Sequence, residues 1–127
     1  MRRIVLLTLA VMLLALPMRA EANHRPTAYC SPSGDICQST RLVDGVRRLR
    51  IGLFAKFFDQ YRLCVKAPDG SRTCRVFEIR DKGATFGSSV RWGRYFPLKG
   101  FGAYVVTWWT GEQKVGRTLG FHRKAPA

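Results

Sequence analysis

The sequence predicts an all-β protein, a two-sheet antiparallel sandwich held together by short disulfides. From residue 45 onward, short segments rich in β-branched and aromatic residues alternate with turn signals such as Pro68-Asp69-Gly70. No segment there repeats apolar residues at the three- and four-residue spacing of a helix for long enough to form one. The four cysteines form an even set with short spacings, which is typical of small disulfide-bonded domains.

The first 22 residues have the composition of a secretory signal peptide. Arg2 and Arg3 precede an apolar run over residues 4–17, and the small residues Ala20 and Ala22 mark a cleavage site. The run is shorter than the roughly 20 apolar residues of a membrane span. We therefore expect cleavage after Ala22, a mature chain of 105 residues with no membrane span, and a periplasmic or extracellular location.

Residues 23–44 are rich in Pro, Ser, Gly, Asp and Thr, which predicts a loop or extended N-terminal arm. Four cysteines allow three pairings, and the spacing favours Cys30 with Cys37 and Cys64 with Cys74, each closing a small loop. Their spacing matches no zinc motif, so we expect no metal site, and no pattern indicates a cofactor.

The sandwich domain is expected over residues 45–123, with a short tail over 124–127. In its first strand, Leu49 and Ile51 alternate with Arg48 and Arg50, the pattern of a strand with one buried face. The expected strands are residues 46–56, 61–66, 72–79, 88–96, 103–109 and 114–122.

The second and third of these strands form a hairpin whose register follows from its turn. With Asp69 at the turn centre, Cys64 faces Cys74, Lys66 faces Arg72 and Arg62 faces Val76, and directly opposed cysteines are close enough to bridge. Arg75 falls on the other side, so that either its side chain reaches the rim or a bulge shifts the register. That other side is otherwise suited to the core, with Tyr61, Leu63, Val65, Thr73, Phe77 and Ile79.

The last part of the chain resembles a known fold family. The segment Gly102-x-Tyr104-x-Val106-x-Trp108, a short turn and then Gly120-Phe121 resemble the final hairpin of bacterial immunoglobulin-like domains. Residues 89–92 and 95–97 are similar to the strand and turn that precede it. The resemblance covers residues 42–122 and implies a small secreted bacterial protein with an immunoglobulin-like sandwich. It implies no catalytic residues, and Cys64 and Cys74 are too close in sequence for the inter-sheet disulfide of antibody domains.

The chain is strongly basic, with 22 Lys and Arg against eight Asp and Glu. Without the signal peptide the numbers are 19 and seven, a formal charge of +12. Such a charge attracts anionic partners, although it fits a role in solubility equally well. An anionic polymer, a cell-wall surface or an acidic protein fits the expected compartment better than a nucleic acid does.

Two features suggest where an anion would bind. Lys66 and Arg72 face each other and carry like charges, so that either an anion offsets their repulsion or both side chains extend into water. The segment 91–95 interleaves cations and rings, a mixture that binds phosphates and stacks on bases or sugars. One of Trp108 and Trp109 must face away from the core. The candidates are Arg62, Lys66, Arg72, Arg91 and Arg94, with Trp92 and Trp109 as aromatic candidates that could instead pack in the core or under an arginine.

We expect a non-catalytic binding or structural module, because no catalytic motif is present. One alternative is a small secreted hydrolase such as a ribonuclease, with Glu78 as base, His122 as acid and Arg91 or Arg94 holding phosphate. Only the residue types support this alternative. Another is an inhibitor or protein-interaction module that docks through a sheet edge or the loop between the first two cysteines.

Overall fold

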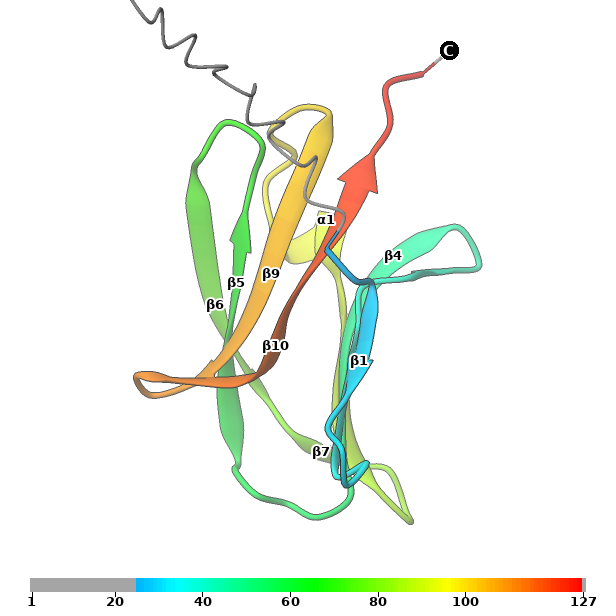
Figure 1. Cartoon of the computed structure of the whole chain (residues 1–127), viewed down its shortest axis with the longest axis vertical. Helices are drawn as coiled ribbons and strands as arrows, with labels where there is room; N and C mark the ends of the chain where they lie inside the picture. The colour runs from blue at the N-terminus through cyan, green and yellow to red at the C-terminus, as the bar shows by residue number, and fades with distance from the viewer. Residues whose placement is uncertain (1–24, 127) are drawn as a thin grey trace, which may run out of the picture.

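The computed structural model describes residues 25–126 and contains two antiparallel β-sheets packed face to face (Figure 1). The predicted signal peptide lies outside the described residues. One sheet has the order β1-β2-β4-β8-β7, with β3 also paired to β4, and the other has the order β10-β9-β5-β6. The predicted all-β two-sheet sandwich is confirmed. The elements are β1 (Ala28–Cys30), β2 (Ile36–Ser39), β3 (Leu42–Val43), β4 (Val46–Leu53), β5 (Gln60–Lys66), β6 (Arg72–Glu78), β7 (Arg80–Asp81), β8 (Phe86–Arg91), α1 (Trp92–Tyr95), β9 (Gly102–Thr110) and β10 (Gln113–Arg123).

Alternate residues of the central strands fill the space between the sheets, as their hydrophobic pattern predicts. Leu63 of β5 and Trp108 of β9 are directly paired and fully buried. Each fully buried side chain of this kind contributes about 1.5–3 kcal/mol to the free energy of folding. The other large core side chains are Leu49, Ile51, Leu53, Tyr61, Val65, Ile79, Val90, Trp92, Phe96, Tyr104, Val106, Val115, Leu119 and Phe121.

The β5–β6 hairpin has the register expected from its turn. Cys64 pairs with Cys74, Lys66 with Arg72 and Arg62 with Val76. The Cys64–Cys74 disulfide is formed, with 4.1 Å between the Cα atoms. The register is unbroken, so Arg75, which is exposed on edge strand β6, lies at the rim of the core without a bulge.

The predicted N-terminal arm contributes strands to the first sheet. β1 and β2 form a hairpin closed by the Cys30–Cys37 disulfide, as predicted, and β2 pairs with β4. The polar composition of this segment predicts a loop, but Gln38 and Thr40 are at most 3% exposed. Their side chains bond to the backbone of β10: the Thr40 hydroxyl donates to the Gly120 carbonyl at 2.7 Å, and Gln38 Nε2 donates to the Val115 carbonyl at 3.0 Å.

β10 contains an irregularity between Val115 and Leu119, where its register with β9 shifts. Gly116 has φ +63° there, and the Arg117 amide donates to Gln38 Oε1 at 3.0 Å. The shift leaves Arg117 exposed while Val115 and Leu119 both remain in the core.

Two of the predicted strands are too long. The strand expected over residues 88–96 ends at Arg91, and one helical turn, α1, follows; the Phe96 amide donates to the Trp92 carbonyl at 3.0 Å. This turn reverses the chain while keeping Trp92 and Phe96 in the core. The strand expected over residues 46–56 ends at Leu53.

The two disulfides indicate an oxidising extracellular or periplasmic environment. No helix in residues 25–126 is both long and apolar enough to cross a membrane.

Candidate functional site

The outer face of the second sheet carries four basic side chains and one tryptophan. The register places Arg62 of β5 opposite Trp109 of β9, and Lys66 opposite Arg72 of β6. Lys114 of β10 pairs with Trp109 from its other side. Because side chains alternate along each strand, all five point away from the core. We call this surface the basic face and define it by Arg62, Lys66, Arg72, Trp109 and Lys114.

Trp109 is the aromatic centre of the basic face. It is half-buried, in contrast to fully buried Trp108, and its indole Nε1 donates to the Thr107 hydroxyl at 2.9 Å. The guanidinium carbons of Arg62 and Arg72 each lie 5.8 Å from the ring centroid. Two cations of β5 and β6 are therefore held near one ring by cation–π attraction, worth about 0.5–1 kcal/mol at a surface site.

The positive charge of the basic face is not neutralised by carboxylates. In residues 25–126 one ion pair forms, Lys56 with Asp59 at 3.2 Å, and it lies in the β4–β5 loop. Glu78 is on the same side of β6 but pairs with Gln60 at the far end of the hairpin. The four cations repel one another, and an anion bound between them would relieve this repulsion.

A pocket of about 770 Å³ opens at the end of the basic face near the β5–β6 turn. Arg25, Lys66 and His122 contribute basic side chains to its lining, and Asp69 contributes a carboxylate. That carboxylate accepts hydrogen bonds from the Ser71 hydroxyl at 2.6 Å and the Ser71 amide at 2.9 Å. These bonds lower the pKa of Asp69, so it stays ionised and serves to fix the turn.

The structure brings together three of the five basic residues predicted from the sequence, together with Trp109. Arg91 lies elsewhere, at the end of β8 in the first sheet, where it pairs with Arg48. Arg94 lies in α1 with its guanidinium 5.5 Å from the Tyr95 ring centroid. Trp92 is only 7% exposed and packs in the core, which was the alternative for this residue.

The residues of the hydrolase alternative are not brought together. Glu78 lies opposite Gln60, at the start of β5. His122 lies opposite Ala103, past the other end of β5, where Lys66 pairs with Val105. At roughly 3.3 Å per residue, the two are about 25 Å apart along the strand direction. Within the described part of the chain, no three His, Cys, Asp or Glu side chains are grouped so that they could hold a metal ion.

The sequence interpretation missed Lys114. Its position could have been found by the argument used for the β5–β6 hairpin, because the turn at Gly111 and Glu112 sets Gln113 opposite Thr110 and Lys114 opposite Trp109. No sequence pattern could have assigned Arg25 to the pocket near the β5–β6 turn. It precedes the first strand and reaches that pocket only because the first described residues pack against β10.

No protein-family model, no curated protein and no solved structure matches this chain.

Proposed function

We propose that this protein is a secreted, non-catalytic binding module that holds an anionic polymer of a cell surface against the basic face. One observation carries the proposal: Trp109 lies between the cations of β5, β6 and β10 on the outer face of the second sheet, where Lys66, Arg72 and Lys114 are exposed. No carboxylate in the described residues pairs with these cations.

The shape of the basic face favours a polymer. Its cations come from three strands, and neighbouring strands are about 4.8 Å apart, so the charges are spread over a flat surface. A chain with repeated negative charges can contact several of them at once, and the contacts add. The Trp109 ring offers an apolar surface on which a sugar ring of the polymer would stack. Arg62 and Arg72, beside that ring, would bind the acidic groups of the polymer.

We propose further that the sandwich is of the immunoglobulin-like type. Tyr104, near the start of β9, donates its hydroxyl to the Gly100 carbonyl at 2.6 Å and accepts from the Lys99 amide at 3.1 Å. A tyrosine that bonds back to the chain just before this strand is typical of immunoglobulin-like folds. The disulfides support secretion through the predicted signal peptide, because such bonds persist in oxidising compartments.

Charge reversal on the basic face is the test. Lys66→Glu combined with Arg72→Glu should weaken binding to a polyuronate or a polyphosphate by at least about tenfold, because two charge-assisted contacts become repulsive. Circular dichroism should show an unchanged fold, since both side chains are exposed.

The matched control reverses two exposed charges away from the basic face, Arg75→Glu with Arg80→Glu. It changes the net charge by the same amount, and its affinity should stay within about threefold of the wild type. Equal losses in both double variants would mean that net charge alone drives binding. Unchanged affinity in the first would remove Lys66 and Arg72 from the site.

A further inference from the structure

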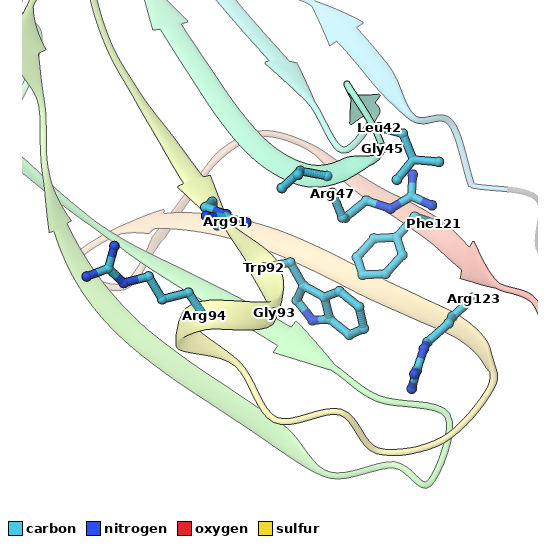
Figure 2. A pocket seen from close by; sticks show the side chains of 10 residues that line it. Leu42, Gly45, Arg47, Arg91, Trp92, Gly93, Arg94, Phe121 and Arg123 are labelled. Atoms are coloured by element: carbon cyan, nitrogen blue, oxygen red, sulfur yellow. The ribbon is translucent and has the colours of Figure 1, made fainter.

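Two pockets of the described chain differ in what they offer to a ligand. The pocket where the β3–β4 hairpin, α1 and the end of β10 meet has a volume of about 710 Å³ (Figure 2). Its rings are covered, because Trp92 and Phe121 are at most 7% exposed and Arg47 lies over Phe121, 4.7 Å from the ring centroid. The pocket near the β5–β6 turn has exposed side chains in its floor and walls. Its position relative to Trp109 indicates how a ligand would lie.

The outward side chains of β9 form a row that runs from this pocket to Trp109. Ala103 is exposed, and Val105, Thr107 and Trp109 are half-buried, whereas the residues between them are buried in the core. We call these four residues the β9 row. β9 lies between β5 and β10, so the row has a strand on either side (Figure 1). The indole Nε1 of Trp109 donates to the Thr107 hydroxyl at 2.9 Å, so the ring leans along the row.

Cations flank the β9 row at two levels. At Trp109 they come from β5 and β10 and belong to the basic face. At Val105, Lys66 of β5 lies on one side and Gly120 of β10 on the other. Gly120 has no side chain, and Arg25 occupies the space: its Cβ and Cδ lie 3.1 and 3.5 Å from the point where a Cβ at Gly120 would be. Lys66 and Arg25 therefore lie on opposite sides of Val105.

The pocket is a groove over the small side chains of Ala103 and Val105. Its volume is about 770 Å³, within the range of small-molecule sites. One wall comes from the end of β5 and the β5–β6 turn, and the other from the chain start and the end of β10. The walls contain Lys66, Pro68, Asp69 and Gly70 on one side, and Arg25, Thr27 and His122 on the other.

We propose that the anionic polymer is an acidic polysaccharide that lies lengthwise along the β9 row, with one sugar unit in the pocket and another stacked on Trp109. This placement rests on the proposed function and gives the bound chain a direction, along β9 rather than across the strands. The acidic group in the pocket would lie between Lys66 and Arg25. At roughly 3.3 Å per residue, Ala103 and Trp109 are about 20 Å apart, the length of about four sugar units.

The charges of the pocket favour a polysaccharide over a polyphosphate. Its walls contain the cations of Arg25 and Lys66 and also the carboxylate of Asp69. An acidic sugar has hydroxyl groups beside its carboxylate, so it can donate to Asp69 while it accepts from the two cations. A polyphosphate has no such donors along its chain and would place negative charge next to Asp69.

Oligouronates of increasing length measure how much of the β9 row a ligand contacts. For the oxidised protein, affinity should rise at least about tenfold from the disaccharide to the tetrasaccharide, because only the longer ligand reaches both Trp109 and the pocket. Longer ligands should add little beyond that. Equal affinities for the disaccharide and the tetrasaccharide would contradict the proposed length.

NMR distinguishes the direction of the bound chain from binding itself. A tetrasaccharide should shift the indole signal of Trp109 together with the backbone amides of Ala103 and His122. If it shifts Trp109 and Arg72 but leaves Ala103 and His122 unmoved, the chain crosses the strands. The placement along β9 is then wrong, although the basic face binds the polymer. If none of these signals moves, both proposals fail.

Arg25→Glu tests the pocket, and Arg41→Glu, an exposed change outside the pocket, is its matched control. Arg25→Glu should weaken tetrasaccharide binding about tenfold or more, whereas Arg41→Glu should stay within about threefold of the wild type. Polyphosphate should lose the same affinity in both variants, because only their net charge matters to it. Full tetrasaccharide affinity in Arg25→Glu, or equal losses in the two variants, would overturn the proposal.

Discussion

Gln38 joins the two sheets through both ends of its side-chain amide. Its Nε2 donates to the Val115 carbonyl and its Oε1 accepts from the Arg117 amide, each at 3.0 Å, and the residue is 3% exposed. Removing it would leave a backbone donor and acceptor of β10 without their partner. We expect Gln38→Ala to lower the free energy of unfolding by about 2–3 kcal/mol. Urea denaturation measures this loss, and an effect below about 0.5 kcal/mol would show that the two hydrogen bonds of Gln38 are dispensable.

Gly116 leaves room for the side-chain amide of Gln38. A Cβ atom at this position would overlap the amide group of Gln38, and the backbone has φ +63°. Gly116→Ala should therefore cost about 3–5 kcal/mol, the sum of a left-handed backbone penalty and the displacement of Gln38.

Gly111 is the matched control for this substitution. Its φ is +57°, but a Cβ there would meet no atom within 4 Å. Gly111→Ala should cost only about 1–2 kcal/mol, the backbone penalty alone. Equal losses in the two alanine variants would contradict the role assigned to the Gln38 contact.

Tyr61 makes stability depend on alkaline pH. Burial raises its pKa to about 12, while the hydrogen bond from its hydroxyl to Ser88 at 2.6 Å acts in the opposite direction. Since the pKa is higher in the folded state, folding favours the neutral phenol. Below pH 10 the phenol is neutral in both states, and the free energy of unfolding does not depend on this group. As pH rises from 10 toward 12 the unfolded state loses the proton first, and the free energy of unfolding falls by about 2–3 kcal/mol in total. The stability of Tyr61→Phe, compared with wild type from pH 8 to 12, should fall less steeply; parallel curves would contradict this.

Among the elements, local hairpins are the part of the fold that the sequence predicts best. The turn at Asp69 determines every pairing of β5 with β6, including the disulfide, because a short turn leaves one register. The N-terminal strands were missed because Gln38 and Thr40 are polar residues whose partners lie in β10, far along the chain. Likewise, α1 depends on the core that receives Trp92 and Phe96 rather than on local pattern.

The two disulfides each stabilise one hairpin. Cys30 and Cys37 are seven residues apart in sequence, and Cys64 and Cys74 are ten apart. By loop-closure entropy, each pair should contribute about 2.5–3 kcal/mol. We expect each double alanine variant to lose this amount in urea denaturation under oxidising conditions. Losses below about 1 kcal/mol would mean that the sheets hold both hairpins without them.

At the scale of the whole molecule, the candidate site depends on pairing between distant strands. Lys66 and Arg72 could be grouped from the sequence because one hairpin joins them. Trp109 joins them only because β9 pairs with β5, a contact between strands far apart in sequence, with Trp109 47 residues after its partner Arg62, that no local pattern specifies.

The measurement that tests the basic face most directly is the salt dependence of polymer affinity. For wild-type protein and a polyuronate, the logarithm of the association constant should fall linearly with the logarithm of salt concentration, because each bound cation releases a counterion. Replacing Lys66 and Arg72 by Gln should reduce the slope by about 2, one unit for each lost contact. The control pair, Arg75→Gln and Arg80→Gln, should leave the slope unchanged. A slope that is the same in all three proteins would contradict the assignment of the basic face as the binding site.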